Sequence, residues 1–251
     1  MQLNHWLKSL VESSPRRRTR AAVSAVELLE DRTLLTTFTV NTTADTVDAN
    51  PGDGLAEDSN GDTSLRAAVM EADSLVGDAV EILLPGGIYV LGGALHFNAG
   101  ADVTLVGDSP SLSIIDGDDV DRVVVVHPGA TVEIQTLAIR NGLSSSGGGG
   151  GILNDGELLL DAVEVTENTV AAFGNGGGIL NRNDLTLSHS TIASNQTPGS
   201  GGAVYSQGPV ATVSIQGSTI SGNTGDEEGG GIVTALGGML EIADSTIVNN
   251  N

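Results

Sequence analysis

The chain has 251 residues, no cysteine and a formal net charge of −22; 39% of its residues are hydrophobic but only 2% are aromatic. The lack of cysteine excludes disulfides and thiolate metal sites. No apolar stretch reaches about 18 residues, so we expect no transmembrane segment.

The charge is unevenly distributed. Six of the ten basic and four of the 32 acidic residues lie before position 36, which leaves four arginines, 28 acids and a net charge of −24 in the rest. Such a surface repels nucleic acid and anionic lipid, so we expect no nucleic-acid partner.

Residues 1–35 form a separate segment. Arg16, Arg17 and Arg18 are shaped like the basic region of a signal, but the apolar stretch after them is short for an ordinary signal peptide. Leu29-Glu30-Asp31-Arg32-Thr33-Leu34-Leu35 resembles the LEPR-XLL-type N-terminal segment of large bacterial surface and secreted proteins, with Asp31 in place of its proline. The resemblance implies export, so we interpret residues 1–35 as an export or sorting segment, either disordered or helical.

Residues 36–79 read as an N-terminal cap. Alternation of Phe38 and Val40 with polar residues predicts a strand over residues 37–47. Residues 63–72 predict a helix, capped by Thr63 or Ser64, with one apolar stripe. A helix at this place would cover the open end of the first coil of a β-structure in the remaining chain, where backbone groups would otherwise lie unpaired.

The loop between that strand and that helix holds a weak calcium motif. Asp58, Asn60 and Asp62 stand at alternate positions, as at the start of a calcium loop. Thr63 replaces the glycine of the sharp turn, and Val69 replaces the bidentate glutamate. An ordinary acidic turn is the main interpretation, and a calcium site the alternative; we expect no other cofactor.

Three parts of the cap and the strand after it resemble a second family. Residues 38–48, Ser64-Leu65-Arg66-Ala67-Ala68 and residues 82–89 resemble the CSLREA domain, which leads into right-handed β-helices of bacterial surface proteins. Thr63 stands where that family has cysteine and Ala67 where it has glutamate.

Residues 80–251 predict a right-handed parallel β-helix, a pectate-lyase-like solenoid. Short apolar runs separated by turns occupy residues 80–84, 103–106, 112–115, 123–126 and 132–139. After residue 147, a glycine-rich segment that ends in Ile or Val opens each of four units, and a Val or Ile followed three residues later by Asn comes next. The paired residues are Val165/Asn168, Ile192/Asn195, Ile220/Asn223 and Ile247/Asn250. A repeat of about 27 residues is typical of a solenoid.

The constant spacing predicts ladders of stacked side chains. One coil rises by about 4.8 Å, so residues one repeat apart lie above one another. We expect Ile139, Val165, Ile192, Ile220 and Ile247 to form an inward apolar column. We expect Asn168, Asn195, Asn223 and Asn250 to stack at a turn, and the glycine runs to form tight corners. No cap follows Asn251, so we expect a truncated product.

The repeats also resemble those of polymorphic outer membrane proteins, which are adhesin-like β-helices. That family has Phe where this chain has Val165, Ile192, Ile220 and Ile247. The resemblance implies a location on the bacterial surface, associated with the outer membrane, or outside the cell.

Catalysis is the main alternative, because β-helices also host polysaccharide lyases and glycoside hydrolases. The candidates are Asp155, Glu157, Asp161, Glu164 and Glu167, with Arg140, Arg182 and His189. Stacking predicts contacts of Asp161 with Ser188 and of Asp155 with Arg182. We expect no carboxylate pair at stacking distance in the repeats, and we expect His96, His127 and His189 to be spread along the coil.

We therefore interpret the chain as a secreted or cell-surface β-helix that acts as an adhesin-like binding or structural module, and favour a non-enzyme. The partners expected are an extracellular polysaccharide or another surface protein.

Overall fold

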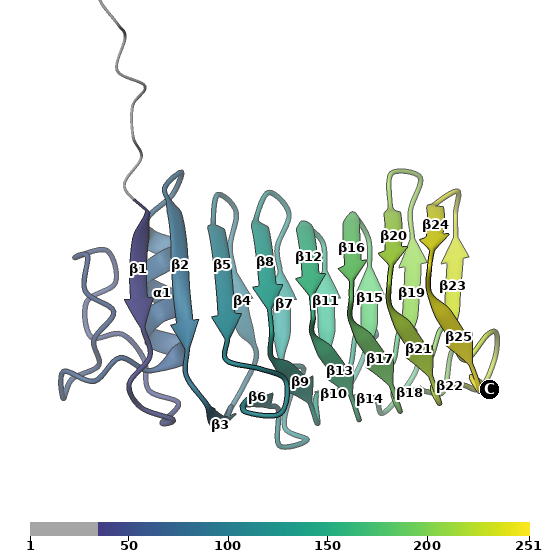
Figure 1. Ribbon diagram of the computed structural model, residues 1–251, viewed down its shortest axis with the longest axis horizontal. Helices are drawn as coiled ribbons and strands as arrows, with labels where there is room; N and C mark the ends of the chain where they lie inside the picture. Colours follow the sequence, from purple (N-terminus) through teal and green to yellow (C-terminus); the bar gives the residue numbers. More distant parts are fainter. Residues whose placement is uncertain (1–34) are drawn as a thin grey trace, which may run out of the picture. The chain divides into compact units, whose positions relative to one another are not determined.

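The computed structural model describes residues 35–251, which form a parallel β-solenoid with one short helix (Figure 1). The predicted all-β, parallel β-helix class is confirmed. The export segment predicted for residues 1–35 lies, apart from Leu35, outside the described residues.

Four parallel sheets, named A to D, make the walls. Sheet A contains β1 (Thr36–Thr39), β2 (Ala79–Leu84), β5 (Asp102–Gly107), β8 (Thr131–Gln135), β12 (Glu157–Asp161), β16 (Asp184–Ser188), β20 (Thr212–Gln216) and β24 (Met239–Ala243). Sheet B contains β3 (Gly87–Val90), β6 (Ser113–Asp116), β9 (Ala138–Arg140), β13 (Glu164–Thr166), β17 (Thr191–Ala193), β21 (Thr219–Ser221) and β25 (Thr246–Val248).

The other two sheets complete each turn. Sheet C contains β4 (Leu95–Phe97), β7 (Val124–Val126), β11 (Ile152–Asn154), β15 (Ile179–Asn181), β19 (Val204–Gln207) and β23 (Ile232–Ala235). Sheet D contains β10 (Leu143–Ser144), β14 (Thr169–Val170), β18 (Gln196–Thr197) and β22 (Thr224–Gly225). From β8 onward the chain runs through sheets A, B, D and C in that order and then returns to A.

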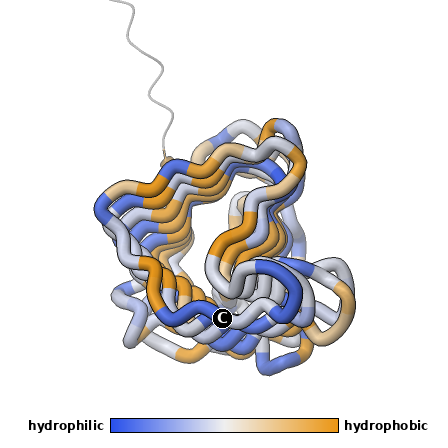
Figure 2. Tube along the Cα trace, turned by 90° about the vertical axis from the view of Figure 1, so that its right-hand side faces the viewer, coloured by the Kyte–Doolittle hydropathy of each residue, from blue (hydrophilic) through white to orange (hydrophobic). Residues whose placement is uncertain are grey.

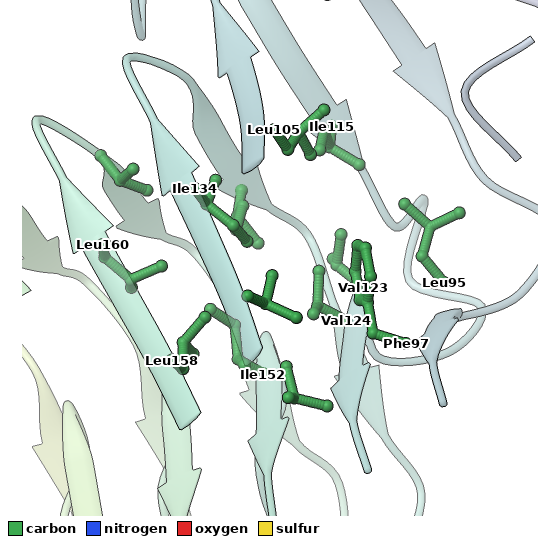
Figure 3. Close-up of a cluster of buried hydrophobic side chains, with 14 of the residues drawn as sticks. Leu95, Phe97, Leu105, Ile115, Val123, Val124, Ile134, Ile152, Leu158 and Leu160 are labelled. Carbon is green, nitrogen blue, oxygen red and sulfur yellow. The ribbon is translucent and has the colours of Figure 1, made fainter. Parts of the chain in front are cut away.

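The core lies inside this coil. Leu105, Ile134 and Leu160 come from neighbouring strands of sheet A and are fully buried, as is Ile152 of sheet C (Figure 3). Each such side chain contributes about 1.5–3 kcal/mol before conformational entropy is subtracted. Viewed end-on, the stacked turns repeat the same sequence of apolar and polar positions (Figure 2). In sheet A, the alternation of buried and more exposed residues therefore continues from β2 to β20.

Two predicted strand boundaries are wrong. The strand expected over residues 37–47 is short, because β1 ends at Thr39. The single run expected over residues 132–139 is two strands in two sheets, β8 and β9. Thr136 between them has a φ of 52°, and this left-handed residue turns the chain from sheet A to sheet B.

The helix α1 (Leu65–Ser74) packs against β4 and β2 at the N-terminal end. The Ser64 hydroxyl caps it by accepting the N–H of Ala67 at 3.0 Å. Leu65, Val69 and Ala72 are buried in the core. Because β1 pairs with β2 while α1 lies against β4, both elements protect edges of the first turn.

The last turn is less protected. Leu240, Ile242 and Ile247 are register partners of buried residues in the preceding turn, yet they are themselves exposed. Ile247, for example, is 46% exposed. Strands β24 and β25 are the last of their sheets and pair on one side only. The same residue types thus contribute less burial here than in the interior turns.

Candidate functional site

The apolar ladder residues are register partners. Val165 pairs with Ile139 and with Ile192, and Ile220 pairs with Ile192 and with Ile247. All but Ile247 are fully buried. The four buried side chains are core and are not available to a ligand.

The asparagine column is a hydrogen-bonded amide ladder. The Oδ1 of Asn195 accepts the backbone N–H of Asn168 at 3.0 Å and its Nδ2–H at 2.9 Å. Asn223 accepts from Asn195 in the same way, and Asn250 from Asn223. Each Nδ2 also donates to a strand carbonyl of the preceding turn, as Asn195 does to Val165 at 2.9 Å. The ladder satisfies buried backbone groups at the turn.

Two further polar ladders were not predicted from the sequence. Asn154 donates through Nδ2 to Oδ1 of Asn181 at 2.8 Å, and Asn181 donates to Oγ of Ser206 at 3.1 Å. A serine ladder is formed by Ser190, Ser218 and Ser245, each of whose hydroxyls accepts a backbone N–H from the preceding turn. The sequence does contain a signal for both ladders, because Ile-Leu-Asn occurs twice and Ser-Thr-Ile three times at the repeat spacing.

The glycine runs are corners built for close stacking. Gly176, the first of its run, has a φ of 71°, which Gly adopts without strain. Gly177 has no such φ, but a Cβ on it would lie 2.7 Å from the backbone nitrogen of Gln196 in the next turn. A side chain at either position would disturb the corner.

Beside these corners, loops from three successive turns line a hollow of about 520 Å³. The loop between β14 and β15 provides residues 171–175, the next turn provides Pro198 and Gly199, and the third provides Glu227. Phe173 is 97% exposed at the tip of the first loop. The other described aromatics, Phe38, Tyr89, Phe97 and Tyr205, are buried or half-buried.

Hydrogen bonds between turns hold this hollow in shape. Oδ1 of Asn175 accepts the N–H of Ser200 at 2.7 Å, and the Thr197 hydroxyl donates to the carbonyl of Gly174 at 2.7 Å. The N–H of Glu227 donates to the carbonyl of Gly199 at 3.1 Å. The loops are therefore tied to one another rather than independent.

The proposed catalytic side chains mostly form pairs on the surface. The expected contacts of Asp155 with Arg182 and of Asp161 with Ser188 are confirmed, the first as an ion pair of 3.3 Å and the second as a register pair. Asp161 also lies 3.0 Å from Nδ1 of His189.

The remaining catalytic candidates lie apart from these pairs. Arg140 forms an ion pair of 2.8 Å with Asp116. Glu164 is an exposed strand residue of β13, and Glu167 is a turn residue with a φ of 59°. Of these three, only Arg140 has an ion-pair partner among the described residues.

The expectation that the repeats contain no stacked carboxylate pair is wrong. Glu157 and Asp184 are register partners on the outer face of sheet A. Together with Glu133 they line a shallow hollow of about 320 Å³. The spacing of one repeat brings them together because both stand first in their strands.

The expectation that the histidines are spread apart is also wrong for two of the three. Nδ1 of His96 lies 3.0 Å from Nε2 of His127, the ring centroids are 5.3 Å apart and the planes differ by 17°. The two rings are nearly parallel, and the distance between the nitrogens is that of a hydrogen bond. Burial and the neighbouring His127 lower the pKa of His96. The sequence did not predict this contact, because the early turns do not follow the regular repeat.

The calcium candidate Asp58 acts as a turn residue. Its Oδ1 accepts the backbone N–H groups of Asn60 at 2.8 Å and Asp62 at 3.1 Å. These two bonds lower the pKa of Asp58. Over residues 35–251, no three His, Asp or Glu side chains converge as a metal-binding group.

Comparisons of the chain with protein-family models, curated proteins and solved structures found no match. Among the residues that the structure describes, no helix is long and apolar enough to span a bilayer.

Proposed function

We propose that this protein is an extracellular binding module that holds a neutral polysaccharide at the hollow beside Phe173. The observation that carries the proposal is the full exposure of Phe173 next to a hollow lined by residues from three turns. A large aromatic side chain exposed beside a hollow that three turns line suggests a binding surface.

The chemistry around Phe173 suits a sugar. A phenyl ring can cover the apolar face of a pyranose, while the Glu227 carboxylate and backbone groups of the loops can bind hydroxyls. The net charge of −24 after position 35 disfavours acidic polymers. The expected ligand is therefore uncharged.

The extracellular location rests on the sequence. The resemblances to the LEPR-XLL segment, to the CSLREA domain and to the repeats of polymorphic outer membrane proteins all belong to exported proteins of the bacterial surface. The parallel β-solenoid is consistent with them, and a binding or structural module is the shared role that they imply.

Binding to immobilised neutral polysaccharides would test the site. Phe173→Ala should reduce affinity about 10-fold or more, because covering such a side chain contributes about 1.5–3 kcal/mol. Val210→Ala is the matched control, since Val210 is a large exposed apolar residue on another loop. Equal affinities of the three proteins would refute the Phe173 site.

A hydrolase is the second candidate, supported by the stacked carboxylates Glu157 and Asp184. Paired carboxyl groups are what glycoside hydrolysis requires. Release of reducing sugar that disappears in Glu157→Gln would replace the binding proposal with an enzymatic one.

A further inference from the structure

The N-terminal cap buries two carboxylates without a cation beside them. Glu71 lies on α1 with its side chain fully buried, and Asp48, in the preceding loop, is only 5% exposed. The four ion pairs of residues 35–251 include neither residue. Burying an unpaired charge is unfavourable, so this arrangement requires an explanation.

Backbone N–H groups stabilise part of the negative charge of these two carboxylates. The two oxygens of Glu71 accept the N–H groups of Gly52 and Gly54, and Oδ1 of Asp48 accepts the N–H of Asn50 at 2.8 Å. The glycines have φ values of 97° and 87°, so the loop bends around the Glu71 carboxylate. Each carboxylate oxygen has a second lone pair that these bonds leave free.

One carboxylate oxygen of this pair has no partner. Oδ2 of Asp48 is buried and makes no hydrogen bond among the described residues. Burial, followed by the Glu71 charge, raises the pKa of Asp48 against the opposing hydrogen bond from Asn50. The surroundings therefore favour either a proton or a cation on this pair.

We propose that Asp48 and Glu71 form a calcium site in the N-terminal cap. The donors are all oxygen, which hard cations prefer, and calcium accepts about six to eight oxygens that include backbone carbonyls and water. Two carboxylates match its charge of two. The ion would join the loop to α1 and so fix the end of the solenoid.

The alternative is a proton shared between Asp48 and Glu71, and one variant separates the two. Asp48→Asn keeps the shape and gives a neutral donor toward Glu71, so it mimics the shared proton but removes a calcium ligand. Asp53→Asn is the matched control, because Asp53 is an exposed acid of the same loop.

The test is thermal unfolding at pH 7 in EDTA and in 5 mM CaCl₂, with calorimetric titration of calcium. With a dissociation constant on the order of 10⁻⁴ M, as in extracellular calcium modules, calcium should favour the folded form about 50-fold. That change raises the melting temperature by about 5 °C.

Wild type and Asp53→Asn should respond to calcium, and Asp48→Asn should not. A wild type that ignores calcium while Asp48→Asn is more stable in EDTA would establish the shared proton and overturn the proposal. Calcium binding of equal strength in Asp48→Asn would also overturn it. The result does not depend on the polysaccharide site, which lies in other turns.

Discussion

The first turns and the later repeats hold their corners by different means. In the cap, Arg66 makes two bonds to Asp45, of 2.7 and 3.0 Å, and donates to the carbonyls of Gly93 and Ala94. In the repeats, neutral Asn and Ser side chains donate and accept in the same way turn after turn. Three of the four arginines after position 35 lie in the part before residue 141.

The difference shows what repetition provides. A ladder works only where the strands of consecutive turns stay in register, because each side chain must meet its copy. Where the corners differ in shape, each one requires its own residue with enough donors to reach several carbonyls, and arginine has five donors. The cap should therefore depend on single charged residues and on pH, and the repeats on the continuity of their ladders.

Breaking the asparagine ladder in its interior should have the largest effect. Asn195→Ala leaves the N–H and amide of Asn168 and the carbonyl of Val165 without this partner, all in a buried turn. We expect a loss of about 3 kcal/mol in the free energy of unfolding, measured in urea. Asn250→Ala, in the half-buried last turn, should lose less than about 1 kcal/mol, and equal losses would contradict the ladder's dependence on burial.

Removing the arginine of the cap should have a smaller and local effect. Arg66→Ala should cost about 2 kcal/mol, because Asp45 and two carbonyls lose charged hydrogen bonds. Hydrogen exchange should accelerate over residues 40–75 and stay unchanged after residue 150. Acceleration throughout the chain would mean that cap and repeats unfold as one unit.

Acid should destabilise the early turns, which precede the regular repeats, through Asp116. Burial raises its pKa, but the bonds from Asn141, Asp118 and Arg140 outweigh burial and lower it overall. A lowered pKa stabilises the folded form above the unfolded value of about 3.9 and loses that effect as the pH falls further. Asp116→Asn should reduce the change in melting temperature between pH 5 and pH 3, by roughly 1 to 2 °C. The same shift in a ladder variant would contradict the assignment.

The repeat made much of the fold predictable. A period of 26 to 28 residues fixes which residues stack, so Val165 could be matched to Ile192 without coordinates. The same period also relates the residues of the Asn154/Asn181 and Ser190/Ser218 ladders, so these ladders too are predictable from the sequence. It also accounts for the meeting of Glu157 and Asp184, which the sequence interpretation overlooked.

Outside the repeat, spacing carries no such information. His96 and His127 meet across turns of unequal length, and Asp48 approaches Glu71 because a loop folds back on a helix. No periodic pattern links those pairs. The exposure of Phe173 also depends on how far its loop extends beyond the corner, which residue type does not determine.

The sequence by itself determined the solenoid, its period and the inward columns, because stacking copies local preferences from turn to turn. Only the tertiary structure decided which acids are buried in the cap, which loops gather around Phe173 and which ladder residue remains exposed. Those features lie at the ends and in the loops, where one turn does not repeat the next. There the contacts of a residue depend on the whole path of the chain.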